Sequence, residues 1–140
     1  MEDRKVLEGE WAHSWRDAIH RFVRQFGLLE TTTTPCGHPL PTSHAHALLE
    51  LLRSPGISQG ELGKRLALTK SGISRLVARL EENGRIVRRV DPADGRVRKL
   101  TLTDPGLKLA KAINKSSLSR FASLVGAIPA ERRQAVLDAL

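Results

Sequence analysis

The chain has 140 residues, 40% of them hydrophobic, and its 23 Lys and Arg against 15 Asp and Glu give a net charge of +8 at pH 7. This length and apolar content suffice for one folded domain and argue against a disordered chain. A single cysteine excludes an intrachain disulfide, and neither a membrane span nor a signal peptide is recognisable, so we expect a cytoplasmic protein without membrane contacts.

The first predicted element is a helix over residues 6–29. Its apolar side chains recur at spacings of three and four, which makes one stripe along the helix: Trp11, Trp15, Ala18, Ile19, Phe22, Phe26 and Leu29. Residues 31–42 contain three prolines and a run of four threonines, so a loop is expected there. Ser43 is a suitable N-cap for a second helix that runs to Arg53.

A pair of short helices is predicted next. The segment Ser58-Gln59-Gly60-Glu61 matches a capping box and predicts the start of a third helix. Thr69 is the expected cap of a fourth helix over residues 70–83, whose apolar positions follow the helical period. Asn83-Gly84 is a typical helix stop, with the glycine in the left-handed conformation.

The rest of the chain predicts a hairpin and two further helices. Residues 85–90 and 97–103 are rich in β-branched residues, and the turn formers of residues 91–96 lie between them. A long helix is expected from Asp104, with Pro105 at its first position. A last helix over residues 130–140 is expected to turn three apolar side chains inward, those of Val136, Leu137 and Leu140. The predicted fold is mainly α with a small β-hairpin, an α+β winged helix-turn-helix.

The positive charge is concentrated in one third of the chain. Between Arg53 and Lys99 there are twelve basic and five acidic residues, so this segment holds +7 of the +8. A local excess of this kind indicates a polyanionic partner. A solvated surface that keeps the protein soluble is the alternative reading of charge alone.

The polar face of helix 70–83 suits a DNA groove. It carries small or basic residues, namely Lys70, Ser71, Ser74, Arg75, Ala78 and Arg79, and arginine can contact guanine in the major groove bidentately. Gly72 permits a close approach to backbone or bases, and the first turn of a helix attracts phosphate. Arg96 at the hairpin tip can enter a narrow A·T-rich minor groove. Surface charge alone, including an Arg79–Glu82 pair, is the alternative.

The sequence resembles the MarR family of bacterial transcription regulators. The resemblance is carried by the runs LEENGRIVRR (80–89), DPADGR (91–96) and LTDPG (102–106). It implies a repressor that binds a pseudo-palindromic duplex as a homodimer in the bacterial cytoplasm, at the nucleoid. It also implies that Arg96 is the minor-groove residue and that Asp94 orients it. In this scheme residues 1–42 and 104–140 form the dimerisation helices and loop, and residues 43–103 form the DNA-binding lobe.

The residues that we expect at the DNA follow from the two preceding arguments. They are Ser58, Thr69, Lys70, Ser71, Gly72, Ser74, Arg75, Arg79, Arg89, Asp94, Arg96 and Arg98.

A dimer is also expected from the apolar stripes themselves. The stripe of helix 6–29 and the stripe from Leu107 to Leu124 hold all five aromatic residues of the chain. A domain of this size has difficulty covering two long stripes alone, although packing of both within one monomer is the alternative.

The signal that releases the DNA is left open by the sequence. Cys36, His38, His44 and His46 lie within eleven residues, and these residue types bind zinc and related metals. Reversible oxidation of Cys36 is a second option. The family pattern suggests a third, an aromatic or phenolic ligand in a cleft bordered by Trp11, His13, Trp15 and Arg16. No cofactor is required by any of these readings.

Other classes of function are less well supported. No nucleophile with a base at a meaningful spacing, no phosphate-binding glycine loop and no convergent carboxylate pair is present, so we do not expect an enzyme. An architectural or protein-interaction winged helix remains the alternative function, but it has no need of both a basic helix and a basic hairpin.

Overall fold

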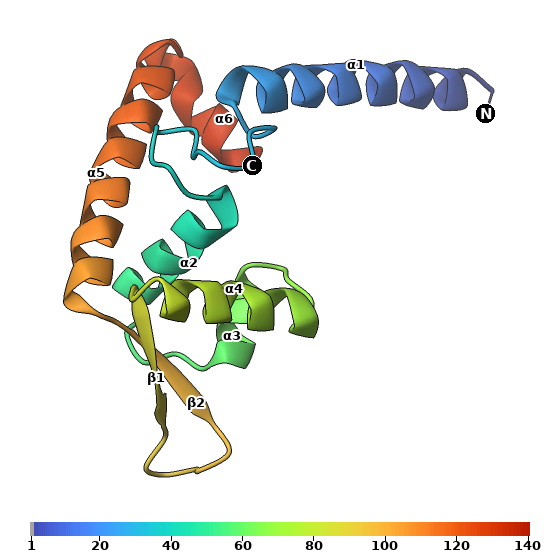
Figure 1. Cartoon of the computed structure of the whole chain (residues 1–140). Helices are drawn as coiled ribbons and strands as arrows, with labels where there is room; N and C mark the ends of the chain where they lie inside the picture. The colour runs from blue at the N-terminus through green and yellow to red at the C-terminus, as the bar shows by residue number, and fades with distance from the viewer. Residues whose placement is uncertain (1) are drawn as a thin grey trace.

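The computed structural model describes residues 2–140, with side chains at residue 9 and from residue 11 onward. Figure 1 shows the order of the elements along the chain. They are α1 (Glu2–Phe26), α2 (Thr42–Arg53), α3 (Gln59–Arg65), α4 (Lys70–Glu82), β1 (Ile86–Val90), β2 (Arg98–Leu102), α5 (Asp104–Gly126), the 3₁₀ turn η1 (Ala130–Arg132) and α6 (Arg133–Asp138). The predicted fold class is confirmed. No helix of the described residues is long and apolar enough to cross a membrane.

Most predicted helix ends are correct because side-chain caps define them. The hydroxyl of Ser58 accepts a hydrogen bond from the Glu61 N–H, and that of Thr69 accepts one from Gly72, both at 3.1 Å. The second half of the capping box is wrong, since the Glu61 carboxylate accepts from Arg65 instead.

Two other predicted boundaries are wrong. The first helix spans Glu2–Phe26 rather than residues 6–29, and it ends early because Gly27 adopts a φ of +88°. Ser43 is not an N-cap, because α2 already begins at Thr42. The carbonyl of Pro41 accepts hydrogen bonds from the N–H groups of His44 and Ala45.

The hydrophobic core lies in the lower lobe of Figure 1, where α2 to α4, the hairpin and the first half of α5 meet. Each of these elements contributes side chains to it. They include Leu48, Leu51, Leu62, Ile73, Leu76, Val77, Leu80, Ile86, Leu100, Ala110 and Ile113. The apolar face of α4 is therefore buried as predicted, which leaves its polar face outward.

The hairpin is joined rigidly to the start of α5. β1 and β2 pair antiparallel in the register Ile86 to Leu102 and Val90 to Arg98. Thr103 then donates its N–H to the Arg85 carbonyl at 3.1 Å and its hydroxyl to the Gly84 carbonyl at 2.6 Å. Gly106 in the first turn of α5 lies so close that a Cβ there would overlap the Arg85 carbonyl oxygen.

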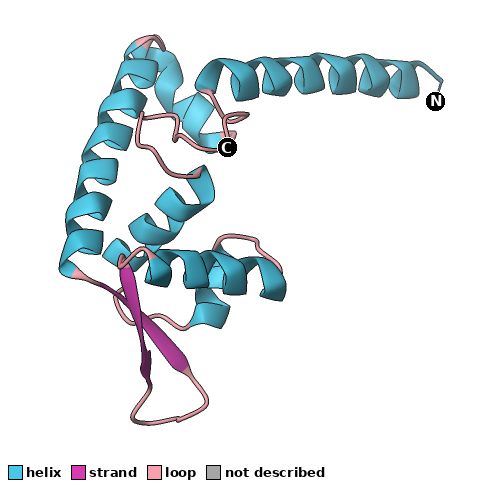
Figure 2. Ribbon diagram, viewed as in Figure 1, coloured by secondary structure: helices cyan, strands magenta, loops and turns pink. Residues whose placement is uncertain are grey.

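The helices at the two chain ends leave apolar side chains in solvent. Figure 2 shows α1 projecting away from the other elements, with α6 beneath its C-terminal end. Trp11 and Trp15 are 65% and 59% exposed, and Phe121 of α5 is 48% exposed. Packing of both apolar stripes within one chain is thus contradicted in the described residues. The predicted inward orientation of Val136, Leu137 and Leu140 is also wrong, because α6 is short and these side chains have no core to enter.

Candidate nucleic-acid interface

The helix-turn-helix is held by a close contact between α3 and α4. A Cβ at Gly63 would lie 3.2 Å from Ile73 Cγ2, so a larger residue would push the two helices apart. In the turn, Ala67 adopts the left-handed conformation with a φ of +52°, which costs a non-glycine residue about 1–2 kcal/mol. Neither role was evident from the sequence, although Gly63 interrupts a predicted helix without an evident reason.

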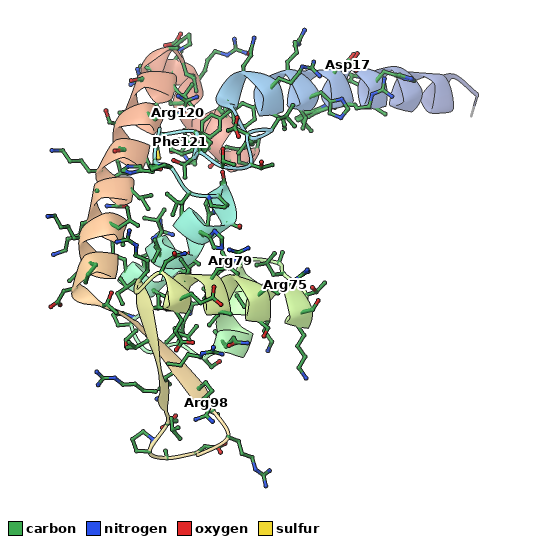
Figure 3. All side chains as sticks on the ribbon, viewed as in Figure 1. Asp17, Arg75, Arg79, Arg98, Arg120 and Phe121 are labelled. Atoms are coloured by element: carbon green, nitrogen blue, oxygen red, sulfur yellow. The ribbon has the colours of Figure 1, made fainter. Side chains whose placement is uncertain are left out.

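The outer face of α4 presents its polar residues to solvent. Lys70, Ser71, Ser74, Arg75 and Arg79 are all exposed, as the DNA hypothesis requires. Figure 3 labels Arg75 and Arg79 on this helix and Arg98 on the hairpin.

Gly72 has a local role that the sequence analysis did not anticipate. Its N–H donates to the Thr69 hydroxyl, and a Cβ at this position would lie 3.1 Å from the same oxygen. The glycine therefore allows the helix cap to form, and it is half-buried rather than open to a groove.

Several basic side chains of residues 53–99 form ion pairs with carboxylates. Arg65 contacts Glu50 and Glu61 at 3.2 Å and so joins α3 to α2, while Arg53 also contacts Glu50. In the described part of the chain, ion pairs involve none of the basic residues that we expect at the DNA, which are Lys70, Arg75, Arg79, Arg89, Arg96 and Arg98. The alternative Arg79–Glu82 pair is likewise absent there. The unpaired positive charge thus collects on α4 and the hairpin.

An ion pair fixes the hairpin to α4. The Arg88 guanidinium of β1 donates two hydrogen bonds to Oε2 of Glu81, the shorter of them from Nη2. These hydrogen bonds hold the pKa of the Glu81 carboxyl below its ordinary value, so the pair stays ionised at neutral pH. The contact spans two elements, and no local pattern in the sequence indicated it.

The hairpin turn is ordered by two aspartates. Asp91 accepts the Ala93 N–H at 2.9 Å and pairs with Lys99 at 3.0 Å, and these contacts lower the pKa of its carboxyl. Asp94 accepts the backbone N–H of Arg96 at 3.0 Å. The expected orientation of Arg96 by Asp94 therefore acts through the backbone, and the guanidinium itself is left exposed at the tip.

The hairpin and the start of α3 border one depression in the surface. It has a volume of about 430 Å³ and is lined by Ser58, Gln59, Gly60, Arg88, Arg96, Val97 and Arg98. This depression brings three of the expected DNA contacts together, namely Ser58, Arg96 and Arg98. The Ser58 hydroxyl already serves the α3 cap there.

The candidate metal ligands do not converge. Cys36 Sγ lies 3.3 Å from the Thr34 hydroxyl, and His38 Nε2 lies 3.1 Å from the Ser116 hydroxyl of α5. His44 faces α4, whereas His46 is exposed. Among the residues that the structure describes, no three side chains of the metal-binding types form a group that could hold an ion. The four side chains therefore form no ion-binding group in this arrangement of the described residues, although Cys36 and His46 line the same small cavity.

A larger cavity lies between the loop before α2 and the end of α4. Its volume is about 510 Å³, and its lining includes His44, Arg79, Asn83 and Arg85 beside apolar residues such as Leu109. Partial burial and, second, the Arg79 charge lower the pKa of the His44 imidazole, so the ring is neutral at pH 7. The expected cleft residues Trp11, His13, Trp15 and Arg16 do not line this cavity.

These features define a winged helix-turn-helix protein. Its second motif helix is followed directly by a two-stranded wing, and the wing is joined to a long helix. Residues 38–97 match the family model described as MarR family. The chain belongs to the MarR family.

Similar bacterial proteins that are named as transcriptional regulators support this assignment. Transcriptional regulator HosA of Escherichia coli O111:H- is 35% identical over 98 residues, 68% of this chain and 70% of HosA. A putative transcriptional regulatory protein for the hcr operon of Thauera aromatica is 33% identical over 105 residues, 74% of this chain. The chain spans 60% of the length of that protein and of the Bacillus subtilis regulator YdgJ.

The fold also resembles that of a protein whose structure has been solved in complex with DNA. The structure of the Staphylococcus aureus MepR–DNA complex superposes with a TM-score of 0.65 and 22% identity, covering 97% of this chain and 91% of MepR. At this identity the likeness concerns the fold.

Proposed function

We propose that this protein is a transcriptional repressor that binds a pseudo-palindromic DNA duplex as a homodimer. The observation that carries the proposal is the placement of cations on the exposed face of α4 and on the wing, where none has a carboxylate partner among the described residues. In the proposed complex Arg75 and Arg79 lie in the major groove and Arg96 enters the minor groove. Ser58, Thr69, Lys70, Ser71, Ser74, Arg89, Asp94 and Arg98 complete the interface, and Gly72 contributes to it through the cap of α4.

The dimer is proposed to form through the helices at the chain ends. The exposed apolar side chains of α1, the second half of α5 and α6 supply the surface, with Trp11, Trp15, Leu118 and Leu137 among its most exposed members. Residues 1–42 and 104–140 are then the dimerisation part, and residues 43–103 the DNA-binding lobe.

Release by a small molecule is the proposed form of regulation. The cavity of about 510 Å³ is large enough for a small organic ligand, and Arg79 belongs both to its lining and to the exposed face of α4. A ligand that contacts this guanidinium would compete directly with DNA for it. Oxidation of Cys36, which is half-buried beside the Thr34 hydroxyl, is the alternative signal. Titration of the thiol before and after treatment with peroxide tests it.

The binding of duplex DNA is expected to depend steeply on salt. If each subunit of the dimer neutralises about five phosphates, a plot of the logarithm of the association constant against the logarithm of the salt concentration should have a slope of about −9. Fluorescence anisotropy measures this slope with a labelled duplex taken from the genomic region next to the gene of this protein. A slope close to zero contradicts DNA binding and favours the protein-interaction alternative.

Truncation of an exposed tryptophan is expected to weaken the dimer. A buried tryptophan covers about 150–250 Å², and Trp15→Ala removes one from each subunit, so we expect the dimer dissociation constant to rise at least about 100-fold. Sedimentation equilibrium checks this. The control is Val90→Ala, which truncates a half-exposed apolar side chain of the wing and should leave the dimer unchanged. Equal dissociation constants for both variants would contradict an α1 interface.

A further inference from the structure

The outer part of the wing has no packing of its own to fix its direction. Only residues 83–85 join α4 to β1, and Gly84 among them adopts a left-handed φ of +65°. The base of the wing is held by the buried side chains of Ile86 and Leu100 and by backbone hydrogen bonds of Leu100 with the segment before α3. Beyond this base no residue of the range 88–98 is buried, and Figure 1 shows the wing extending past the helices.

One ion pair ties this outer part to α4. Arg88 lies opposite Leu100 in the strand register, so the two side chains leave the hairpin on the same face, and Leu100 on that face is buried. Nε and Nη2 of Arg88 both donate to Oε2 of Glu81, Nε at 2.8 Å. Among the side-chain hydrogen bonds and ion pairs of the described residues, no other joins residues 88–99 to α4. The angle between the outer wing and α4 therefore depends on this pair.

The pair lies between the two proposed DNA contacts. Glu81 follows Arg79 by two positions, which correspond to a rotation of about 200° around the helix, so its side chain points away from that of Arg79. Arg88 lines the depression that Arg96 and Arg98 also line. The side chains of the pair are 34% and 37% exposed, and an ion pair with this much solvent contact contributes little to stability. Its effect is therefore expected in the direction of the wing rather than in the unfolding temperature.

We propose that Glu81 and Arg88 are positioning residues that determine the base-pair preference of the wing, an inference that rests on the proposed function. With the pair intact, a subunit seated in the major groove by Arg75 and Arg79 brings Arg96 to one position along the duplex. At that position Arg96 discriminates a narrow A·T-rich minor groove from a wider one. Without the pair the wing adopts several directions, and Arg96 contacts phosphates of any flanking sequence. The preference for A·T pairs is then lost, although the major-groove contact remains.

The test measures the ratio of the association constants for two duplexes that share one genomic binding segment and differ only in A·T or G·C flanks. We expect a ratio of at least about 5 for the natural chain and of about 2 or less for Glu81→Gln and for Arg88→Met. These two substitutions change the net charge in opposite directions. A simple charge effect would therefore shift the affinities of the two variants in opposite directions and leave the ratio unchanged. The exchanged pair, Glu81→Arg with Arg88→Glu, should restore the ratio.

The matched control is Glu61→Gln. It removes a carboxylate from another exposed ion pair, the one with Arg65 inside α3, and should keep the ratio of the natural chain. If Glu81→Gln and Arg88→Met both keep that ratio as well, the proposal is overturned.

A second measurement needs no DNA and so separates this proposal from the proposed function. Amide hydrogen exchange of residues 89–98 should be about two- to fivefold faster in Glu81→Gln and Arg88→Met than in the natural chain, with the amides of Ile86 and Leu100 unchanged. Unchanged exchange of residues 89–98 would overturn the tie itself. If the natural chain binds neither duplex, the proposed function fails, and faster exchange in the variants would still establish the tie.

Discussion

Gly106→Ala is expected to lower the free energy of unfolding by about 2–4 kcal/mol. The new Cβ would overlap the carbonyl oxygen of Arg85, and this oxygen is also the acceptor for the Thr103 N–H. Backbone atoms on both sides of the contact cannot move aside like a flexible side chain, so the start of α5 must separate from the wing. Urea unfolding followed by circular dichroism measures the loss.

The matched control is Gly60→Ala. Gly60 also lies in the first turn of a helix, but its Cβ would meet nothing nearer than the Ser58 hydroxyl at 4.0 Å. This variant should be neutral or gain up to about 1 kcal/mol, since alanine favours the helix. If both variants unfold at the same urea concentration, the result contradicts a close contact of Gly106 with the Arg85 carbonyl.

Arg96→Ala is expected to weaken operator binding by about 1–3 kcal/mol, or roughly 5- to 150-fold, without a change in stability. The exposed guanidinium has no carboxylate partner among the described residues, so its loss leaves the turn intact. The loss should be larger for sites flanked by A·T pairs than for sites flanked by G·C pairs. Anisotropy titrations on two such duplexes measure both effects.

Two further variants separate the wing contact from simple charge. Arg132→Ala removes an exposed arginine of η1, remote from the interface, and should change the affinity little. Arg96→Lys keeps the charge but not the planar guanidinium, so it should recover only part of the affinity. Equal affinity of Arg96→Ala and the natural chain on the A·T-flanked duplex would show that the wing does not enter the minor groove.

The local features of the fold could be predicted from the sequence because each depends on neighbouring residues. The periodic positions Ile73, Leu76, Val77 and Leu80 are buried as expected, and Thr69 forms the cap that its position before them indicated. The outward face of α4 followed from the same period. The hairpin was recognisable from its β-branched strands and its turn residues.

The long-range features could not be predicted in this way. The Arg88–Glu81 pair and the contact of Gly106 with Arg85 join separate elements, and their partners are known only once the chain is folded. The sequence grouped Cys36 with the nearby histidines by proximity along the chain, yet His38 bonds to Ser116, 78 positions away. The stripe of α1 was predicted from its period, but its side chains are exposed in the single chain, and the proposed dimer would bury them.

α5 connects the two ends of the molecule without a break. Its 23 residues make it about 34 Å long. Gly106 near its start contacts the wing, and Phe121 in its second half contacts the ring of Phe26. Since the Arg88–Glu81 pair ties the wing to α4, a lever of this length would carry the recognition helix and the wing together. A tilt of about 5° at one end displaces the other by about 3 Å, close to the rise of one base pair. In the proposed dimer, small adjustments at the end of α5 remote from the wing would therefore be enough to bring both proposed DNA contacts into or out of phase with the duplex.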